Sequence, residues 1–166
     1  MVGDDRPGIV AGITEALFEL GCNLEDVSST ILRGHFTMML IVRAPAGVMA
    51  EEAAEALARV EREMDLVVRV GEVADVHEPL VAPTHVVSVY GADRPGIVFR
   101  VAEVLAARGV NITDLRSRVL DSVGEPAYVL MMEVVAPGGA LDDDLEATRR
   151  EMNVEVSVNR IDPELL

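Results

Sequence analysis

The sequence of 166 residues contains no lysine, no tryptophan and a single cysteine, and only 3% of its residues are aromatic. A single cysteine excludes an intrachain disulfide and is typical of a protein in a reducing compartment. No uninterrupted run of about 18 apolar residues is present, so we expect no membrane-spanning helix. The N-terminus lacks a basic segment followed by an apolar one, so we expect no signal peptide. These absences favour a cytoplasmic protein that does not associate with membranes.

Positive charge is also scarce. The 14 basic residues, all of them arginine, stand against 29 acidic residues, and the net charge is −15. The acidic excess is spread along the chain, with 6 arginines against 15 acids in residues 1–78 and 8 against 14 in residues 79–166. Such a surface repels phosphate backbones. We therefore expect no direct binding to nucleic acid.

What the sequence does contain is an internal repeat. Residues 3–33 and 91–121 match at a constant offset of 88 positions, and 14 of the 31 aligned positions are identical. Both copies retain an Asp-Arg-Pro-Gly segment at residues 5–8 and 93–96, a glycine at 21 and 109, and an asparagine at 23 and 111. Because the other positions have diverged, the retained residues are the first candidates for function.

Each copy is predicted to have the element order strand, helix, strand, strand, helix, strand. In the first copy we expect a helix over 9–20, strands over 27–32 and 36–42, a helix over 50–64 and a strand over 66–70. In the second copy we expect strands over 84–90, 115–120, 127–135 and 154–158, a helix from 97 to the cap at 109, and a helix carrying Leu141, Leu145, Thr148 and Met152 on one side. The modules are residues 1–71 and 84–161, joined by a linker over 72–83.

The first strand of the first copy is expected to be truncated. Only Met1 and Val2 precede Gly3, whereas a whole β-branched run precedes Gly91 in the second copy. In a split βαβ arrangement the first strand is central, so its loss is costly. We expect the upstream reading frame to encode roughly five to eight further residues, largely apolar and β-branched, as strands of ordinary length require.

The Asp-Arg-Pro-Gly segments open the first helix of each copy. The free N–H groups and the positive dipole at a helix N-terminus suit a carboxylate, and glycine lets a ligand approach closely. A purely structural interpretation is also open: aspartate as the N-cap, proline in the first turn, and glycine for a tight turn.

Asn23 and Asn111 follow the glycine that ends this helix and are predicted to precede a strand. An asparagine side chain both donates and accepts hydrogen bonds, which fits the ammonium and carboxylate of an amino acid. The alternative is structural, an Asx turn or a left-handed backbone conformation.

Other reactive residues give weaker signals. His35, His77 and His85 fall in a turn, a linker and a strand start without the spacing of metal ligands, so we expect no metal and no cofactor. Cys22 is interpreted as a small buried residue, because Val110 replaces it in the second copy. No nucleophile, base and orienting residue occur together, and no loop has the spacing of a phosphate-binding loop. We therefore expect no enzymatic activity.

With the Gly-x-Asp-Arg-Pro-Gly-Ile-Val and Gly-x-Asn-[Leu/Ile]-x-Asp motifs present twice, the chain resembles the ACT domain family. Within that family it is similar to the tandem proteins related to the glycine cleavage system transcriptional repressor. The resemblance covers residues 1–160 and implies the α+β fold class, with two ferredoxin-like βαββαβ modules in tandem whose antiparallel sheets carry helices on one face. It also implies binding of amino acids or similar small metabolites at module interfaces. The predicted ligand-binding residues are Asp5, Arg6, Pro7, Gly8, Ile9, Asn23 and Leu24 in the first copy, and Asp93, Arg94, Pro95, Gly96, Ile97, Asn111 and Ile112 in the second.

The function expected from these features is a non-enzymatic regulator that responds to an amino acid. Its partner would be a protein, either a transcription factor of amino-acid metabolism, glycine metabolism included, or a metabolic enzyme. Two alternatives stay open: an accessory regulatory subunit of an amino-acid-metabolic enzyme, and an interaction scaffold that binds no ligand. Homodimerisation is compatible with each of them.

Overall fold

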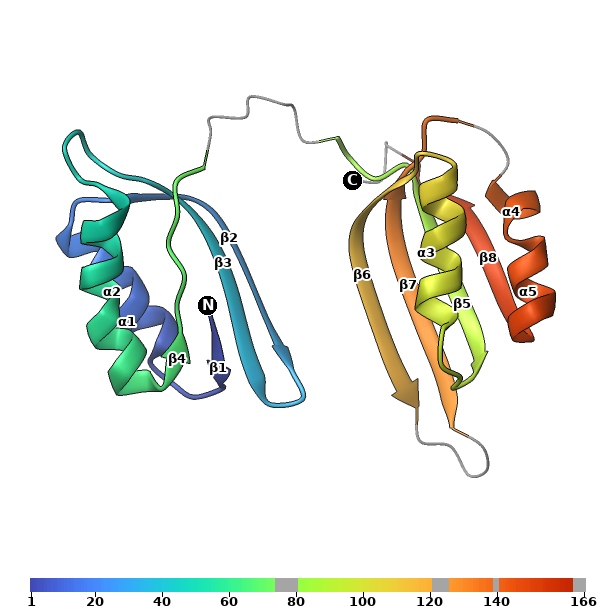
Figure 1. Ribbon diagram of the computed structural model, residues 1–166, viewed down its shortest axis with the longest axis horizontal. Coiled ribbons are helices and arrows are strands. Elements are labelled where there is room, and N and C mark those ends of the chain that lie inside the picture. Colours follow the sequence, from blue (N-terminus) through green and yellow to red (C-terminus); the bar gives the residue numbers. More distant parts are fainter. Residues whose placement is uncertain (74–80, 121–125, 139–140, 163–166) are drawn as a thin grey trace. The chain divides into compact units, whose positions relative to one another are not determined.

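The computed structural model describes residues 1–73, 81–120, 126–138 and 141–162 (Figure 1). The chain divides into two compact units, residues 1–77 and 78–166, here called module 1 and module 2. Each module contains one four-stranded antiparallel sheet. The predicted α+β class with two ferredoxin-like modules is confirmed.

Module 1 has the strand order β2-β3-β1-β4. Its elements are β1 (Val2–Asp4), α1 (Ile9–Glu19), β2 (Asn23–Leu32), β3 (His35–Arg43), α2 (Ala50–Met64) and β4 (Leu66–Val67). The central strand β1 pairs with both β3 and β4, although it is only three residues long.

Module 2 has the same arrangement, with the strand order β6-β7-β5-β8. Its elements are β5 (His85–Ala92), α3 (Ile97–Ala107), β6 (Asn111–Leu120), β7 (Ala127–Val135), α4 (Leu141–Asp144), α5 (Glu146–Met152) and β8 (Val154–Arg160). The central strand β5 has eight residues and pairs along its length with β7 and β8.

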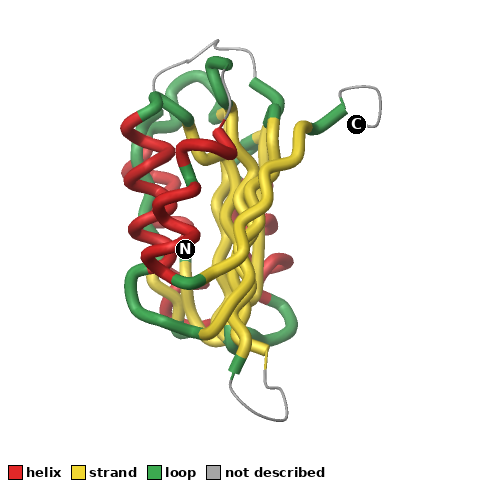
Figure 2. The backbone as a smooth tube through the Cα atoms, turned by 90° about the vertical axis from the view of Figure 1, so that its right-hand side faces the viewer, coloured by secondary structure: helices red, strands yellow, loops and turns green. Residues whose placement is uncertain are grey.

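The core of each module lies between the helices and one face of the sheet, and Figure 2 distinguishes the two kinds of element. Burial alternates along β7, because Leu130, Met132 and Val134 are fully buried while Met131 is exposed. On α3, Val101 and Leu105 meet this face at helical spacing. Buried apolar residues recur at every second position on the strand and about every 3.6 positions on the helix, so they face one another in the core.

Four predicted elements differ clearly from the structure. Strands β2 and β6 begin at Asn23 and Asn111, four residues earlier than predicted, because pairing with β3 and β7 overrides the low strand propensity of Asn and Asp. The last helix of module 2 is divided into α4 and α5 at Leu145. Strand β4 ends at Val67 rather than residue 70, because β1 pairs with only Leu66 and Val67.

Two retained glycines have a packing reason. Gly3 and Gly91 lie on the central strands opposite Leu66 and Val154. A Cβ at Gly3 would lie 2.6 Å from the Leu66 side chain, and one at Gly91 would lie 2.8 Å from the Val154 side chain. Both distances are too short for real contacts, so the fold itself requires glycine at these positions.

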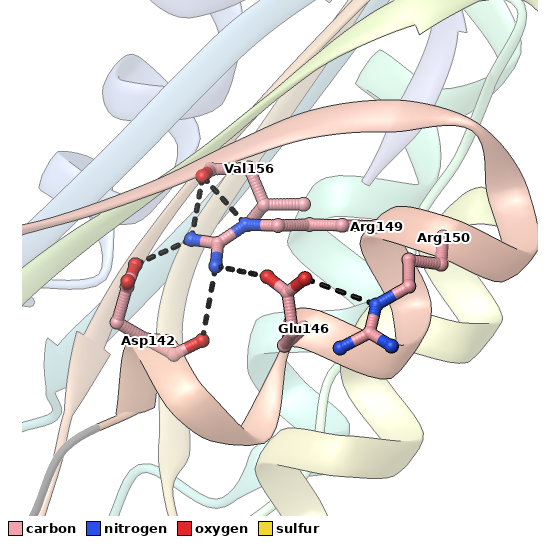
Figure 3. Close-up of polar contacts among 5 residues, drawn as sticks. All are labelled: Asp142, Glu146, Arg149, Arg150 and Val156. Carbon is pink, nitrogen blue, oxygen red and sulfur yellow. Dashed lines mark hydrogen bonds and ion pairs between the residues drawn. The ribbon is translucent and has the colours of Figure 1, made fainter.

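A charged side chain covers the outer edge of β8. The guanidinium of Arg149 on α5 donates to the main-chain carbonyl of Val156 at 3.0 and 2.7 Å and pairs with Glu146 and Asp142 (Figure 3). Hydrogen bonds with these carboxylates raise the pKa of Arg149, and the bonds from Arg149 and Arg150 lower the pKa of Glu146. Charged side chains over an edge strand discourage further strand pairing there.

The equivalent contact in module 1 has the opposite polarity. Glu61 stands 88 positions before Arg149, and Val68 stands 88 positions before Val156. The Glu61 carboxylate accepts a hydrogen bond from the Val68 N–H at 2.9 Å. The main chain at this position is therefore hydrogen-bonded to a helix side chain in both modules. The N–H of Val68 is bound by a carboxylate, and the carbonyl of Val156 is bound by a guanidinium.

Candidate functional site

The Asp-Arg-Pro-Gly loops end in a left-handed glycine that caps the first helix. Gly8 has φ 97° and ψ −13° and is the N-cap of α1, while Gly96 has φ 96° and ψ −4° and is the N-cap of α3. No side chain makes a capping hydrogen bond at either helix. The structural interpretation of Asp5 and Asp93 as N-caps is therefore wrong. Pro7 and Pro95 precede the cap rather than forming the first helical turn, because the glycine conformation starts the helix one residue later.

This geometry leaves the helix N-termini open. The first helical bonds run from the N–H of Gly12 to Gly8 and from the N–H of Arg100 to Gly96. The N–H groups between them have no intrahelical partner, because the first turn of any helix lacks one. In the described part of the chain no side chain caps them, so they are available to an anion.

The loop side chains are exposed, and only one of them is held by the fold. Arg6 donates to the main-chain carbonyl of Met64. Its counterpart Arg94 makes no hydrogen bond within the described ranges, and neither do the carboxylates of Asp5 and Asp93. Backbone contacts hold the loops instead, through the N–H groups of Asp5 to Gly34 at 2.9 Å and of Asp93 to Pro126 at 3.4 Å.

The apolar site residues have a different environment. Ile9 and Ile97 are core residues, 1% and 2% exposed, so they present only main-chain atoms to a ligand. Leu24 and Ile112 are partly buried and pack against the cores. Packing alone explains the retention of apolar residues at these four positions.

Asn23 and Asn111 are the first residues of the edge strands β2 and β6, where they pair with Arg43 and Val135. Both are exposed. Neither has a positive φ, since the described non-glycine residues with positive φ are Arg33, Asp65 and Asn153. Among the described contacts, neither side chain makes a hydrogen bond. The structural interpretation, an Asx turn or a left-handed conformation, is therefore wrong for both asparagines.

A β-bulge follows each asparagine at the same place. The register shifts between Leu24 and Asp26 in module 1 and between Ile112 and Asp114 in module 2. The bulged residues, Glu25 and Thr113, were not among the predicted site residues, and an irregularity of pairing has no signal in a single sequence. Bulges are over-represented beside functional sites, where they redirect a neighbouring side chain.

Each module has a shallow surface depression that includes predicted site residues. In module 1 it lies at the asparagine and is lined by Ala11, Thr14, Glu15, Leu17, Phe18, Cys22, Asn23 and Leu24. In module 2 it lies at the loop and is lined by Asp93, Arg94, Gly96, Ile97, Val98, Phe99 and Tyr128. Phe18 and Phe99 are 79% and 61% exposed, although the chain has few aromatic residues. Neither phenylalanine was predicted from the sequence as a site residue. The only sign of them there is that each is an apolar residue at a helix position outside the spacing of the buried residues.

Within one module the loop and the asparagine lie at opposite ends. The Asp5 N–H bonds Gly34 at the turn between β2 and β3, whereas Asn23 pairs with Arg43 at the far end of the same two strands. The eleven residues of α1 separate the two motifs by about 16 Å. Module 2 repeats this geometry. A ligand as small as an amino acid therefore cannot touch both motifs of a single module.

The other reactive residues, His35, His85 and Cys22, contact neighbouring side chains or the core. His35 lies 3.0 Å from the Asp4 carboxylate, and His85 lies 2.9 Å from the Thr84 hydroxyl, while His77 lies outside the described residues. Cys22 is partly buried against the core. In the described ranges no group of three His, Cys, Asp or Glu residues is placed to hold a metal ion.

None of the helices in those ranges is both long and apolar enough to cross a membrane.

Two family models match the chain, one over residues 1–71 and the other over residues 85–151, and each describes an ACT domain. The chain belongs to the ACT domain family. Its two ACT modules together resemble the glycine cleavage system transcriptional repressor of Escherichia coli (strain K12). The identity is 28% over 166 aligned positions, which cover 95% of this chain and 86% of that protein.

Solved structures share the fold of the ACT modules. An unknown protein from Galdieria sulphuraria matches with a TM-score of 0.75 and 23% identity, covering 97% of this chain and 95% of that one. A putative glycine cleavage system transcriptional repressor matches with a TM-score of 0.69 and 19% identity, covering 96% and 93%. The predicted resemblance to tandem ACT proteins of the repressor group is confirmed.

Proposed function

We propose that this protein is a non-enzymatic regulator that binds a small amino acid through its two ACT modules and controls a protein partner. The observation that carries the proposal is the retention of Asn23 and Asn111. Both residues are exposed, lie in extended strands and make no side-chain hydrogen bond among the described residues, so the fold gives no reason to keep asparagine in both copies. A ligand that uses the amide gives that reason.

The chemistry of the two motifs is complementary to an amino acid. The open N–H groups at the start of α1 and α3 bind the carboxylate, because they combine free donors with the positive end of the helix dipole. The side-chain carbonyl of the asparagine accepts a hydrogen bond from the ammonium, and its NH₂ group donates to a carboxylate oxygen. Neither step needs a catalytic base or a metal.

The two motifs that contact one ligand belong to two different copies of the ACT module, because a single module holds them about 16 Å apart. Ligand binding then favours the arrangement of modules in which a loop and an asparagine meet. A ligand shifts an equilibrium by its difference in affinity between two states. A partner that distinguishes the two arrangements senses the amino acid.

The partner is a protein rather than DNA. The net charge of −15 opposes contact with phosphate backbones, and both modules are acidic. The similarity to a protein named as a transcriptional repressor of the glycine cleavage system favours a transcription factor as the partner and glycine as the first ligand to test.

A thermal-shift screen with the twenty proteinogenic amino acids tests the proposal. Binding at a hundredfold excess over the dissociation constant stabilises the folded state by about 2.7 kcal/mol, which is readily measured as a rise in melting temperature. We expect glycine or another small amino acid to give this rise, and Asn23→Ala or Asn111→Ala to reduce it.

The matched control is Asn159→Ala. Asn159 is also an exposed strand asparagine, but it lies on β8 outside both motifs. We expect the Asn159→Ala protein to keep the full ligand-induced shift. A shift that survives in the Asn23→Ala, Asn111→Ala double variant, or that is lost in Asn159→Ala, contradicts the proposed site.

A further inference from the structure

The sheet of module 1 has an uncharged centre on its outer face, the face opposite the helices. Residues alternate between the two faces along each strand, and the buried Phe36 and Met38 mark the inner face of β3. The pairing of β1, β2 and β4 then places the outward residues of the four strands beside one another. We call the following exposed set the module 1 face: Val2, Ser28, Thr30, Thr37, Met39, Ile41 and Val67.

Module 2 carries charges at the equivalent positions. The matching strand registers give the equivalent residues as Tyr90, Arg116, Arg118, Val129, Met131, Glu133 and Glu155. Four of these seven are charged, whereas the module 1 face contains no charged residue. Met39 is 69% exposed and its equivalent Met131 is 51% exposed. Because Met131 pairs with a long β5, a methionine at this position is exposed whatever the length of the neighbouring strand.

The apolar side chains of the module 1 face form a continuous surface. Val2 lies opposite both Val67 and Thr37, and Met39 and Ile41 follow Thr37 on the same side of β3. All four apolar residues are exposed. A contiguous exposed apolar surface on a soluble domain marks an interaction site. Two sheets pack face to face about 10 Å apart when their side chains interdigitate, so a second sheet fits such a surface.

The charge distribution indicates that the second sheet belongs to another copy of the chain. Residues 1–78 carry 6 arginines against 15 acids, so two copies of module 1 repel each other through most of their surface. The module 1 face avoids this repulsion, and at its ends Asp4 pairs with His35 at 3.0 Å and Arg43 pairs with Glu25. Serine and threonine hydroxyls both donate and accept hydrogen bonds, so they can face identical groups across a two-fold axis. A basic partner would instead be attracted to the acidic surfaces.

The size of the face sets the expected strength of the association. Strand β3 has nine residues. It is therefore roughly 30 Å long, and with β2 and the shorter β1 and β4 the sheet presents a flat area on the order of 400 Å². A standard interface buries about 800 Å² per partner, and smaller ones are typical of weak, reversible complexes. The face thus suits a dimer that dissociates on dilution.

We propose that two copies of the chain associate through their module 1 faces into a two-fold symmetric dimer with the two sheets packed face to face. Met39, Ile41, Val2 and Val67 are the apolar centre of this interface. Module 2 takes no part in it, because Arg116, Arg118, Glu133 and Glu155 would be desolvated there. The dimer goes beyond amino-acid binding and does not require a ligand.

Sedimentation velocity of the full chain without ligand tests the proposal, from low micromolar to several hundred micromolar protein. The variant Met39→Glu is compared with Met131→Glu, which changes the same residue type at the equivalent exposed position of module 2. A second variant, Ile41→Glu, introduces the residue that module 2 already accommodates as Glu133. Circular dichroism checks that each variant is folded.

We expect a reversible monomer–dimer equilibrium whose dissociation constant rises by about tenfold or more in Met39→Glu and Ile41→Glu, because like charges then oppose each other in the interface. Met131→Glu should leave the constant unchanged. A monomer at every concentration, or an equal effect of Met39→Glu and Met131→Glu, overturns the proposal. Methyl chemical shifts of the unmodified chain give a second measurement: changes on dilution at Met39 but not at Met131 support the interface, and the reverse contradicts it.

Discussion

Replacing the N-cap glycines of α1 and α3 with alanine should destabilise each module through backbone strain alone. Gly8 and Gly96 have φ of 97° and 96°, a conformation that an L-residue rarely adopts. The nearest atoms to an added Cβ are the methionine tips Met64 Cε at 3.4 Å and Met152 Cε at 3.9 Å, so crowding contributes little. A left-handed conformation costs a non-glycine residue about 1–2 kcal/mol, and the φ here lies beyond its usual range.

Alanine also restricts the unfolded chain, which offsets roughly 0.4–1 kcal/mol of this strain. We therefore expect Gly8→Ala and Gly96→Ala each to lower the free energy of unfolding by about 1 kcal/mol, which corresponds to about 4–8 °C in a module of this size. Urea unfolding followed by circular dichroism measures the change. The control is Gly71→Ala, where φ is not left-handed and no atom lies within 4 Å, so stability should be unchanged or slightly higher. A Gly96→Ala protein as stable as wild type, or an equal loss in Gly71→Ala, would refute the reasoning.

Three further results are expected. Arg149→Ala should destabilise module 2 by about 1.5–3 kcal/mol in urea unfolding, because it removes charged hydrogen bonds to a strand carbonyl. Glu61→Ala should destabilise module 1 by about 1.5 kcal/mol, at the lower end of this range, because Glu61 accepts a single hydrogen bond. The pKa of Glu146 is lowered from 4.5 in the folded protein, so its ion pairs stabilise module 2 above about pH 4.5 and are lost as the pH falls through the lowered pKa. The difference in the free energy of unfolding between wild type and Glu146→Gln, measured across that range, should therefore shrink toward acid pH. In a gel-shift assay at physiological salt the protein alone should not bind DNA, and sub-micromolar binding would mean that any action on transcription is direct.

Most of the fold was predictable because the apolar periodicity is regular. Helix α2 and strand β7 have the predicted bounds, since apolar residues recur at helical spacing on α2 and at every second position on β7, and turn residues lie at their ends. The starts of β2 and β6 were not predictable. Asn23-Leu24-Glu25-Asp26 has low strand propensity, and only pairing with β3, interrupted by a bulge, makes it a strand.

The candidate site was predictable as a set of residues but not as a geometry. Repetition identified Asn23 and Asn111 without indicating that each begins a strand. It also could not separate glycines kept for backbone conformation, such as Gly8, or for close packing, such as Gly3, from residues kept for a ligand. The separation of about 16 Å between loop and asparagine follows from the helix between them, which sequence motifs alone do not convey.

Isothermal titration calorimetry with glycine and the other proteinogenic amino acids tests the central claim most directly. The account predicts saturable heat for at least one small amino acid, loss of part of the signal in Asn23→Ala or Asn111→Ala, and no signal in the double variant. The two sites should differ in affinity, because Cys22 and Glu25 beside Asn23 are replaced by Val110 and Thr113 beside Asn111. We expect the site at Asn111 to be the tighter one, because its module has the longer central strand. The absence of heat with every amino acid, together with unchanged partner binding in both asparagine variants, would contradict the ligand hypothesis and favour a scaffold instead.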